Sequence, residues 1–75
     1  MTLEEASLAA LEAARTGDLD ALSEALAARA GALAAGEPPT PGVHAAGELT
    51  VQLVRELIRE AVLEAARARQ MESYR

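Results

Sequence analysis

Cysteine is absent from the sequence, which excludes disulfides and thiolate metal sites. Histidine occurs once, at His44, so a histidine-based metal centre within one chain is not expected. No serine, histidine and acid constellation stands out, and the glycines lack the spacing of a phosphate-binding loop. These absences predict a protein that is not an enzyme and that holds no cofactor.

Aromatic residues are almost absent as well, at 1% of the chain, with no phenylalanine or tryptophan. The apolar content of 51% is mostly alanine and leucine, which favour helices and are poor strand formers. The composition therefore predicts an all-α fold with a thin core. A chain of 75 residues forms one domain at most and is marginally stable alone, so we expect a partner chain to stabilise it.

Lysine is missing too, and all seven basic residues are arginines in a chain with a net charge of −5. The excess of acid lies in the first half, and no basic footprint for nucleic acid is present. Charges interrupt every window long enough to span a membrane. The start, "MTLEEASLAAL", lacks the positive region of a signal peptide. We expect a cytoplasmic protein with neither nucleic-acid nor membrane partners.

The first predicted helix covers about 3–35. Thr2 and Glu5 have the spacing of a capping box, which marks the start of a helix. Gly36 suits the left-handed position after a helix, and Pro38 and Pro39 forbid continuation. A loop is therefore predicted over about 36–40.

The second predicted helix covers about 41–73. Thr40 is a candidate N-cap, and Pro41 is then at the first helical position, where proline is favoured. Gly42 and Gly47 weaken the first turns, so the start of the helix stays open between Pro41 and Glu48. Two helices joined by a short loop predict an antiparallel hairpin.

The stretch "AARTGDLDAL" allows two interpretations. Gly17 followed by Asp18 is a typical end of one helix and start of the next. At about 100° per residue, however, six leucines on both sides of this point fall within about 80° of arc on one continuous helix. That shared phase favours an unbroken helix with Gly17 on its outer face or at a local kink. The predicted seam of the hairpin is then Leu8, Leu11, Leu19, Leu22, Leu26 and Leu33.

The second helix has an apolar arc of about half its circumference, wider than one neighbour requires. A single hairpin supplies only one neighbour, so the arc predicts contact with another chain. That chain is a second copy in a homodimeric four-helix bundle, or a helix of a bound client. The predicted partner or dimer interface is Val51, Val54, Leu57, Ile58, Ala61, Val62 and Ala65.

Two arginines, Arg15 and Arg29, lie on the leucine stripe of the first helix. In an antiparallel hairpin, the short loop places Arg15 near Glu60 or Glu64 and Arg29 near Glu48. The two arginines are expected to pair across the hairpin and fix its register. The alternative is that they anchor a carboxylate of a client.

The segment "LAALEAARTGDLDALSEALAARAGAL" resembles the first helices of FliT-like flagellar export chaperones, which serve the filament-cap protein. The matching residues are Gly17, Asp18, Ala21, Leu22 and Arg29, over about a third of the chain. The resemblance implies a small helical chaperone-like protein that binds a client. The alternative is a structural or regulatory homodimer without a client.

A second resemblance is to ankyrin repeats. "EAARTGDLDALSEALAARA" is similar to an ankyrin helix pair, and Thr40 and Pro41 followed by "HAA" are similar to the T-P-L-H-x-A turn. This resemblance implies a short interaction module whose first helix turns back at Gly17. The leucine phase across Gly17 favours the hairpin over this alternative.

Overall fold

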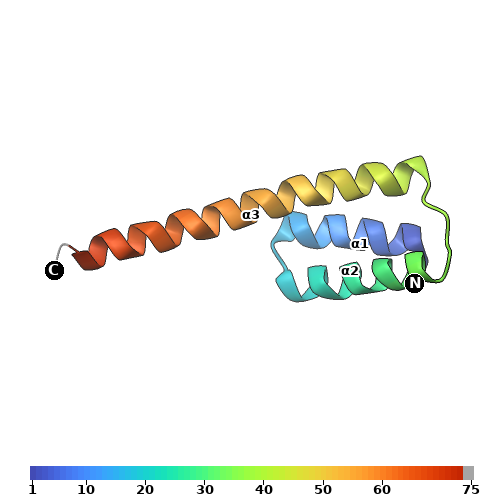
Figure 1. The fold of residues 1–75 in the computed structure, drawn as a ribbon, viewed down its shortest axis with the longest axis horizontal. Helices are drawn as coiled ribbons and strands as arrows, with labels where there is room; N and C mark the ends of the chain where they lie inside the picture. The colour runs from blue at the N-terminus through green and yellow to red at the C-terminus, as the bar shows by residue number, and fades with distance from the viewer. Residues whose placement is uncertain (74–75) are drawn as a thin grey trace.

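The computed structural model of the chain describes residues 1–73. Within this range the only secondary structure is three helices and the segments that join them, with no strand (Figure 1). Helix α1 spans Leu3–Thr16, α2 spans Leu19–Ala34 and α3 spans Pro41–Ser73. The predicted all-α class is confirmed. The predicted two-helix hairpin is wrong, because the first predicted helix is two helices that fold back on each other.

The chain turns at Gly17. Its φ of 72° is left-handed, and its N–H bonds to the carbonyl oxygen of Ala14 while the N–H of Asp18 bonds to that of Ala13. These two bonds form a Schellman motif, which satisfies carbonyls at the end of α1. The Asp18 side chain then accepts a hydrogen bond from the N–H of Ala21 at 3.0 Å and caps α2. The continuous helix over 3–35 is therefore corrected to a helix–turn–helix.

The leucine phase predicts the wrong fold because the faces by which the helices pack are formed mainly by alanine. Ala10 and Ala14 of α1 and Ala25 of α2 are buried in the main core cluster. Small side chains let the two helices pack closely and leave the longer leucines outside. Of the predicted seam, Leu11 and Leu22 are buried, whereas the exposed leucines are Leu8, Leu19, Leu26 and Leu33. The predicted seam is wrong for those four.

Several of the predicted helix-end signals are present in the structure. Thr2 and Glu5 form the reciprocal capping box at the start of α1, with both bonds at 3.1 Å. Gly36 ends the turn after α2 with a φ of 89°. Thr40 Oγ1 accepts a hydrogen bond from the N–H of Val43 at 3.2 Å, so α3 begins at Pro41 rather than near Glu48.

The connection between α2 and α3 is tied to the start of α1. The Glu37 carboxylate accepts a hydrogen bond from the backbone N–H of Leu3 at 3.2 Å. A carboxylate at a helix N-terminus also meets the positive end of the helix dipole. Beside this bond, a second small cluster of buried residues joins Leu3, Ala32 of α2 and Val43 of α3. The three helix ends at this end of the molecule are therefore held together.

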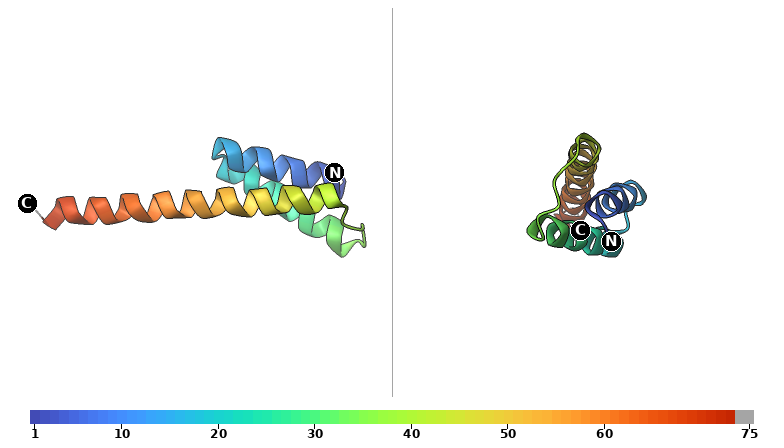
Figure 2. Two further views of the ribbon diagram at one scale, coloured as in Figure 1. Left: turned by 90° about the horizontal axis from the view of Figure 1, so that it is seen from above. Right: turned by 90° about the vertical axis from the view of Figure 1, so that its right-hand side faces the viewer.

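Helix α1 packs against both other helices (Figures 1 and 2). Helix α2 runs antiparallel to α1, and α3 runs parallel to it. Leu53 and Val54 of α3 pack against the main cluster. Over the described residues, no Cα atom of α2 lies within 8 Å of one in α3, so these two helices are splayed over α1.

The first half of α3 completes a three-helix head, and its second half extends beyond it (Figure 1). The molecule measures 55 × 19 × 19 Å, with a radius of gyration of 15.9 Å. A compact domain of this length has a radius of gyration of about 11 Å. The elongated shape comes from the projecting part of α3, residues 57–73, which we call the overhang.

Candidate functional site

Within residues 1–73, no other helix packs along the overhang. At about 1.5 Å per residue it is roughly 25 Å long. Every residue from Ile58 to Glu72 is exposed. In proteins, most of a helix's stability comes from the packing of an apolar face. The overhang lacks such packing within the described chain.

The overhang nevertheless carries a continuous apolar face. Ile58 and Val62 are 59% and 61% exposed, and the exposed Ala61 and Ala65 lie beside them at helical spacing. We call these four residues the overhang face. Leu63, 45% exposed, lies about 150° round the helix from the centre of this face and so on its far side. Exposed apolar surfaces of this kind mark interaction sites when they are contiguous.

The predicted partner interface falls in two places. Its members in the overhang face are exposed, as an intermolecular surface requires. Val54 and Leu57 are half-buried, and Val54 packs against the core of the head. Val51 is 51% exposed and lies on the head, next to a groove. The interface remains a prediction for the exposed members, while Val54 serves the core.

The groove opens between α2 and α3 and has a volume of about 580 Å³. It exists because these two helices are splayed, and its floor is the buried Ser7 and Ala10 of α1. Leu26 of α2 and Val51 of α3 supply exposed apolar walls. We call it the Arg29 groove; its lining also includes Arg29, His44, Gly47, Glu48, Thr50, Gln52 and Arg55.

Arg29 crosses from α2 towards α3. A Cβ at Gly47 would lie 3.3 Å from Nη2 of Arg29, so the absence of a side chain at Gly47 gives the guanidinium its room. Arg29 is half-buried, yet no carboxylate in the described part of the chain forms an ion pair with it. A guanidinium is always charged and presents donors in a planar fork that matches a carboxylate.

Two polar atoms at the groove are buried without a hydrogen bond among the described residues, Ser7 Oγ and Arg29 Nε. Ser7 is only 2% exposed. Buried polar groups without partners are rare in folded proteins because each carries a desolvation cost. By contrast, the buried Thr50 hydroxyl donates to the carbonyl oxygen of Ala46 at 2.7 Å.

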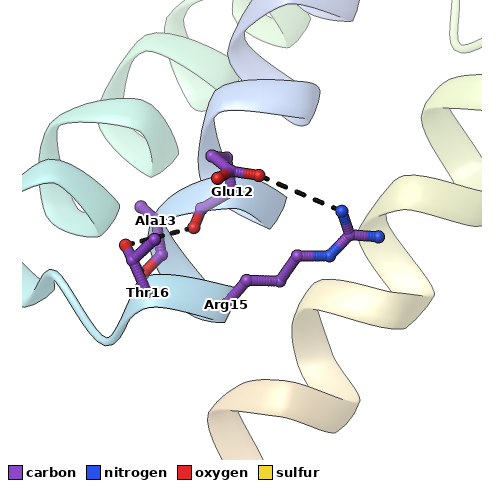
Figure 3. A network of polar contacts seen from close by, with 4 residues as sticks. All are labelled: Glu12, Ala13, Arg15 and Thr16. Atoms are coloured by element: carbon purple, nitrogen blue, oxygen red, sulfur yellow. Dashed lines mark hydrogen bonds and ion pairs between the residues drawn. The ribbon is translucent and has the colours of Figure 1, made fainter.

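The predicted register pairs do not form. Arg15 lies 3.9 Å from Glu12 in its own helix, beside Thr16, whose hydroxyl hydrogen-bonds to the backbone of Glu12 and Ala13 (Figure 3). Because α1 ends at the next residue, Arg15 does not approach Glu60 or Glu64. The pair is exposed and worth little free energy.

Glu48 pairs with His44 at 3.1 Å when the imidazole is protonated, not with Arg29. Arg29 and Glu48 nonetheless line the same groove. The predicted neighbourhood of these two residues is therefore correct, although the predicted ion pair is not. The turn at Gly17 takes Arg15 away from its predicted neighbours on α3. Helices α2 and α3 still run antiparallel, so Arg29 and Glu48 stay close to each other.

Sequence reasoning missed the groove as a site. The available signal was a glycine within α3, Gly47, together with an arginine on an apolar stripe, Arg29. Within residues 1–73, no group of histidine, aspartate and glutamate side chains has an arrangement that would hold a metal ion. Over the same residues, no helix combines the length and the apolar character needed to cross a bilayer.

Comparison with known proteins gave no match to a family model, to a curated protein or to a solved structure.

Proposed function

We propose that this chain is a small cytoplasmic, non-enzymatic helical binding protein that presents the overhang face to a helix of a partner protein. The observation that supports the proposal most directly is the exposure of Ile58 and Val62 on the part of α3 that extends beyond the other two helices. An amphipathic helix that packs along this face would bury both side chains, at about 25 cal/mol per Å² of apolar surface.

The first candidate client is a flagellar filament-cap protein, on the resemblance of the first two helices to FliT-like chaperones. The matching Gly17 and Asp18 make the turn between α1 and α2, and Arg29 lines the groove. A client helix is a partner whose chemistry fits the surface, because it supplies apolar side chains at a spacing of three and four residues.

The proposal is tested by binding of purified filament-cap and export-apparatus proteins to the chain and to two variants. Val62→Glu places a charge on the overhang face and is expected to weaken binding at least tenfold. Leu63→Glu places the same charge on the opposite side and is the matched control, with binding unchanged. Equal loss in both variants, or no retention of either protein by the unchanged chain, counts against a client.

The second candidate function is a structural or regulatory homodimer without a client. The same exposed face supports it, because a chain of 75 residues gains stability by pairing. Sedimentation equilibrium separates the two candidates. A dimer that Val62→Glu converts to a monomer favours the second candidate, and a monomer at all concentrations favours the first.

A further inference from the structure

We propose that the Arg29 groove binds a carboxylate, and that this carboxylate is a glutamate or aspartate side chain of the partner helix. The inference rests on the proposed function for the source of the carboxylate, but the groove's chemistry stands on its own contacts. It extends the binding surface from the overhang onto the head.

The charge of the groove is the first support. Two guanidinium groups, of Arg29 and Arg55, line it against one carboxylate, of Glu48. That carboxylate is 3.1 Å from His44. A chain with a net charge of −5 therefore has a locally basic hollow. The Arg29 charge is half-buried and unpaired within the described residues, which is a costly arrangement unless an anion completes it.

The donors on the floor are the second support. Ser7 Oγ is buried without a hydrogen bond at the base of the groove, and Nε of Arg29 is unsatisfied in the same way. An incoming carboxylate offers two acceptor oxygens with about four lone-pair positions. It matches the unused donors of the guanidinium fork and the hydroxyl. A dianionic phosphate fits less well, because Glu48 lies at the same groove.

The direction of the α3 surface points to a helix as the carrier. Val51 in the groove wall and Ile58 in the overhang face are seven residues apart, and Val62 follows four residues later. Such residues share one side of a helix. One partner helix along this side thus contacts Ile58 and also reaches the groove. There, Leu26 and Val51 flank the aliphatic part of the partner's acidic side chain.

The geometry specifies the partner's sequence pattern. Gly47, against which Arg29 lies, is eleven residues before Ile58, or about 17 Å along the helix axis. A partner helix packed along α3 therefore carries its acidic residue about eleven residues from the apolar residue that meets Ile58. Eleven residues is close to three full turns, so both side chains point the same way.

The groove is tested first with the α-amide of N-acetylglutamate, which carries only the side-chain carboxylate, read by the Nε–Hε NMR signal of Arg29. Its uncharged analogue, the α-amide of N-acetylglutamine, is the matched control ligand. The signal is expected to shift with the glutamate amide and to stay in place with the glutamine amide. Equal shifts with both ligands, or none with either, overturn the carboxylate site without bearing on the overhang.

The source is tested with a pair of designed helical peptides that carry leucines at heptad spacing and either Glu or Gln eleven residues from a central leucine. Replacing Glu by Gln in the peptide is expected to weaken its binding to the unchanged chain about tenfold. The same replacement is expected to leave binding to the Arg29→Gln variant unchanged. The control variant is Arg59→Gln, which changes an exposed arginine of the overhang outside the groove lining. This variant is expected to bind the Glu peptide more tightly than the Gln peptide, as the unchanged chain does.

Each failure has its own meaning. Peptides that bind equally tightly with Glu and Gln overturn the partner carboxylate and leave the proposed function standing. Peptides that do not bind at all, together with the expected response to the α-amide of N-acetylglutamate, overturn the partner helix as the source. Because Arg29→Gln changes a half-buried side chain, circular dichroism is used to check that the variant keeps the helix content of the unchanged chain. Gly47→Ala, which crowds Nη2 of Arg29, is the second variant and is expected to reduce the Glu preference.

Discussion

At the scale of single residues, Gly17 decides the architecture. Its left-handed backbone and the Asp18 cap reverse the chain between α1 and α2. The sequence showed both local signals, and the ankyrin-like resemblance implied the same turn. The leucine phase outweighs these signals only if leucine marks the core. A phase argument holds only for the residues that make the contact, and here most of those are alanines.

Two glycine variants are expected to have opposite effects on the free energy of unfolding. Gly17→Ala places a side chain at a φ of 72° and should destabilise the chain by about 1 kcal/mol. Gly31→Ala lies within α2 with open space around it and should stabilise by roughly 0.5–1 kcal/mol. Urea denaturation measures both. Stabilisation by both variants is the result that a continuous helix through Gly17 gives.

The capping box predicts a pH-dependent contribution of Glu5. The hydrogen bond from the backbone N–H of Thr2 holds the pKa of Glu5 below its ordinary value of 4.5, and a side-chain bond with Thr2 acts in the same direction. Because the pKa of Glu5 is lower in the folded chain than in the unfolded chain, its charge stabilises the fold fully at a pH above the unfolded-state pKa. This stabilisation is lost as the pH falls through the folded-state pKa.

The stability difference between the unchanged chain and Glu5→Gln is therefore expected to shrink as the pH is lowered through this range. Glutamine keeps the shape of the capping side chain, so the comparison isolates the charge. Urea midpoints between pH 3 and pH 6 provide the measurement. A difference that stays constant with pH rejects the charged form of Glu5 as the source.

At the scale of elements, alanine allows α1 to pack against two helices at once. The start of α3 at Pro41 was one of the predicted possibilities, because Thr40 and Pro41 act locally as an N-cap and a first helical residue. The pairing of elements was less predictable. Alanine-rich faces carry little periodic contrast with the rest of a helix, so composition gives no sign of which face is buried.

Enlarging a buried alanine is expected to separate the helices. Ala10 is 1% exposed between α1 and its neighbours, and Ala10→Leu should destabilise the chain by about 1–3 kcal/mol through overpacking. Ala61→Leu makes the same change on the exposed overhang and should alter stability by less than about 0.5 kcal/mol. Thermal and urea unfolding give both values. Equal losses would place Ala61 in a packed environment.

At the scale of the whole molecule, a three-helix head carries a helix that extends beyond it. The wide apolar arc of the second predicted helix did indicate that it needs more than one neighbour, and the exposed Ile58 and Val62 agree with that idea. The Arg29 groove was not predictable as a site, because it depends on how far α2 and α3 are splayed over α1. Spacing along one chain does not determine that separation.

The proposed function requires that the overhang, within the described residues, lacks the packing that stabilises the rest of α3. Residue-resolved amide hydrogen exchange on the dilute chain measures this difference. Strong protection is expected at Ala46 to Val54, where α3 packs on α1, with a steep fall beyond Ile58. Protection from Val62 to Met71 as high as that from Ala46 to Val54, in a sample shown to be monomeric, would contradict it.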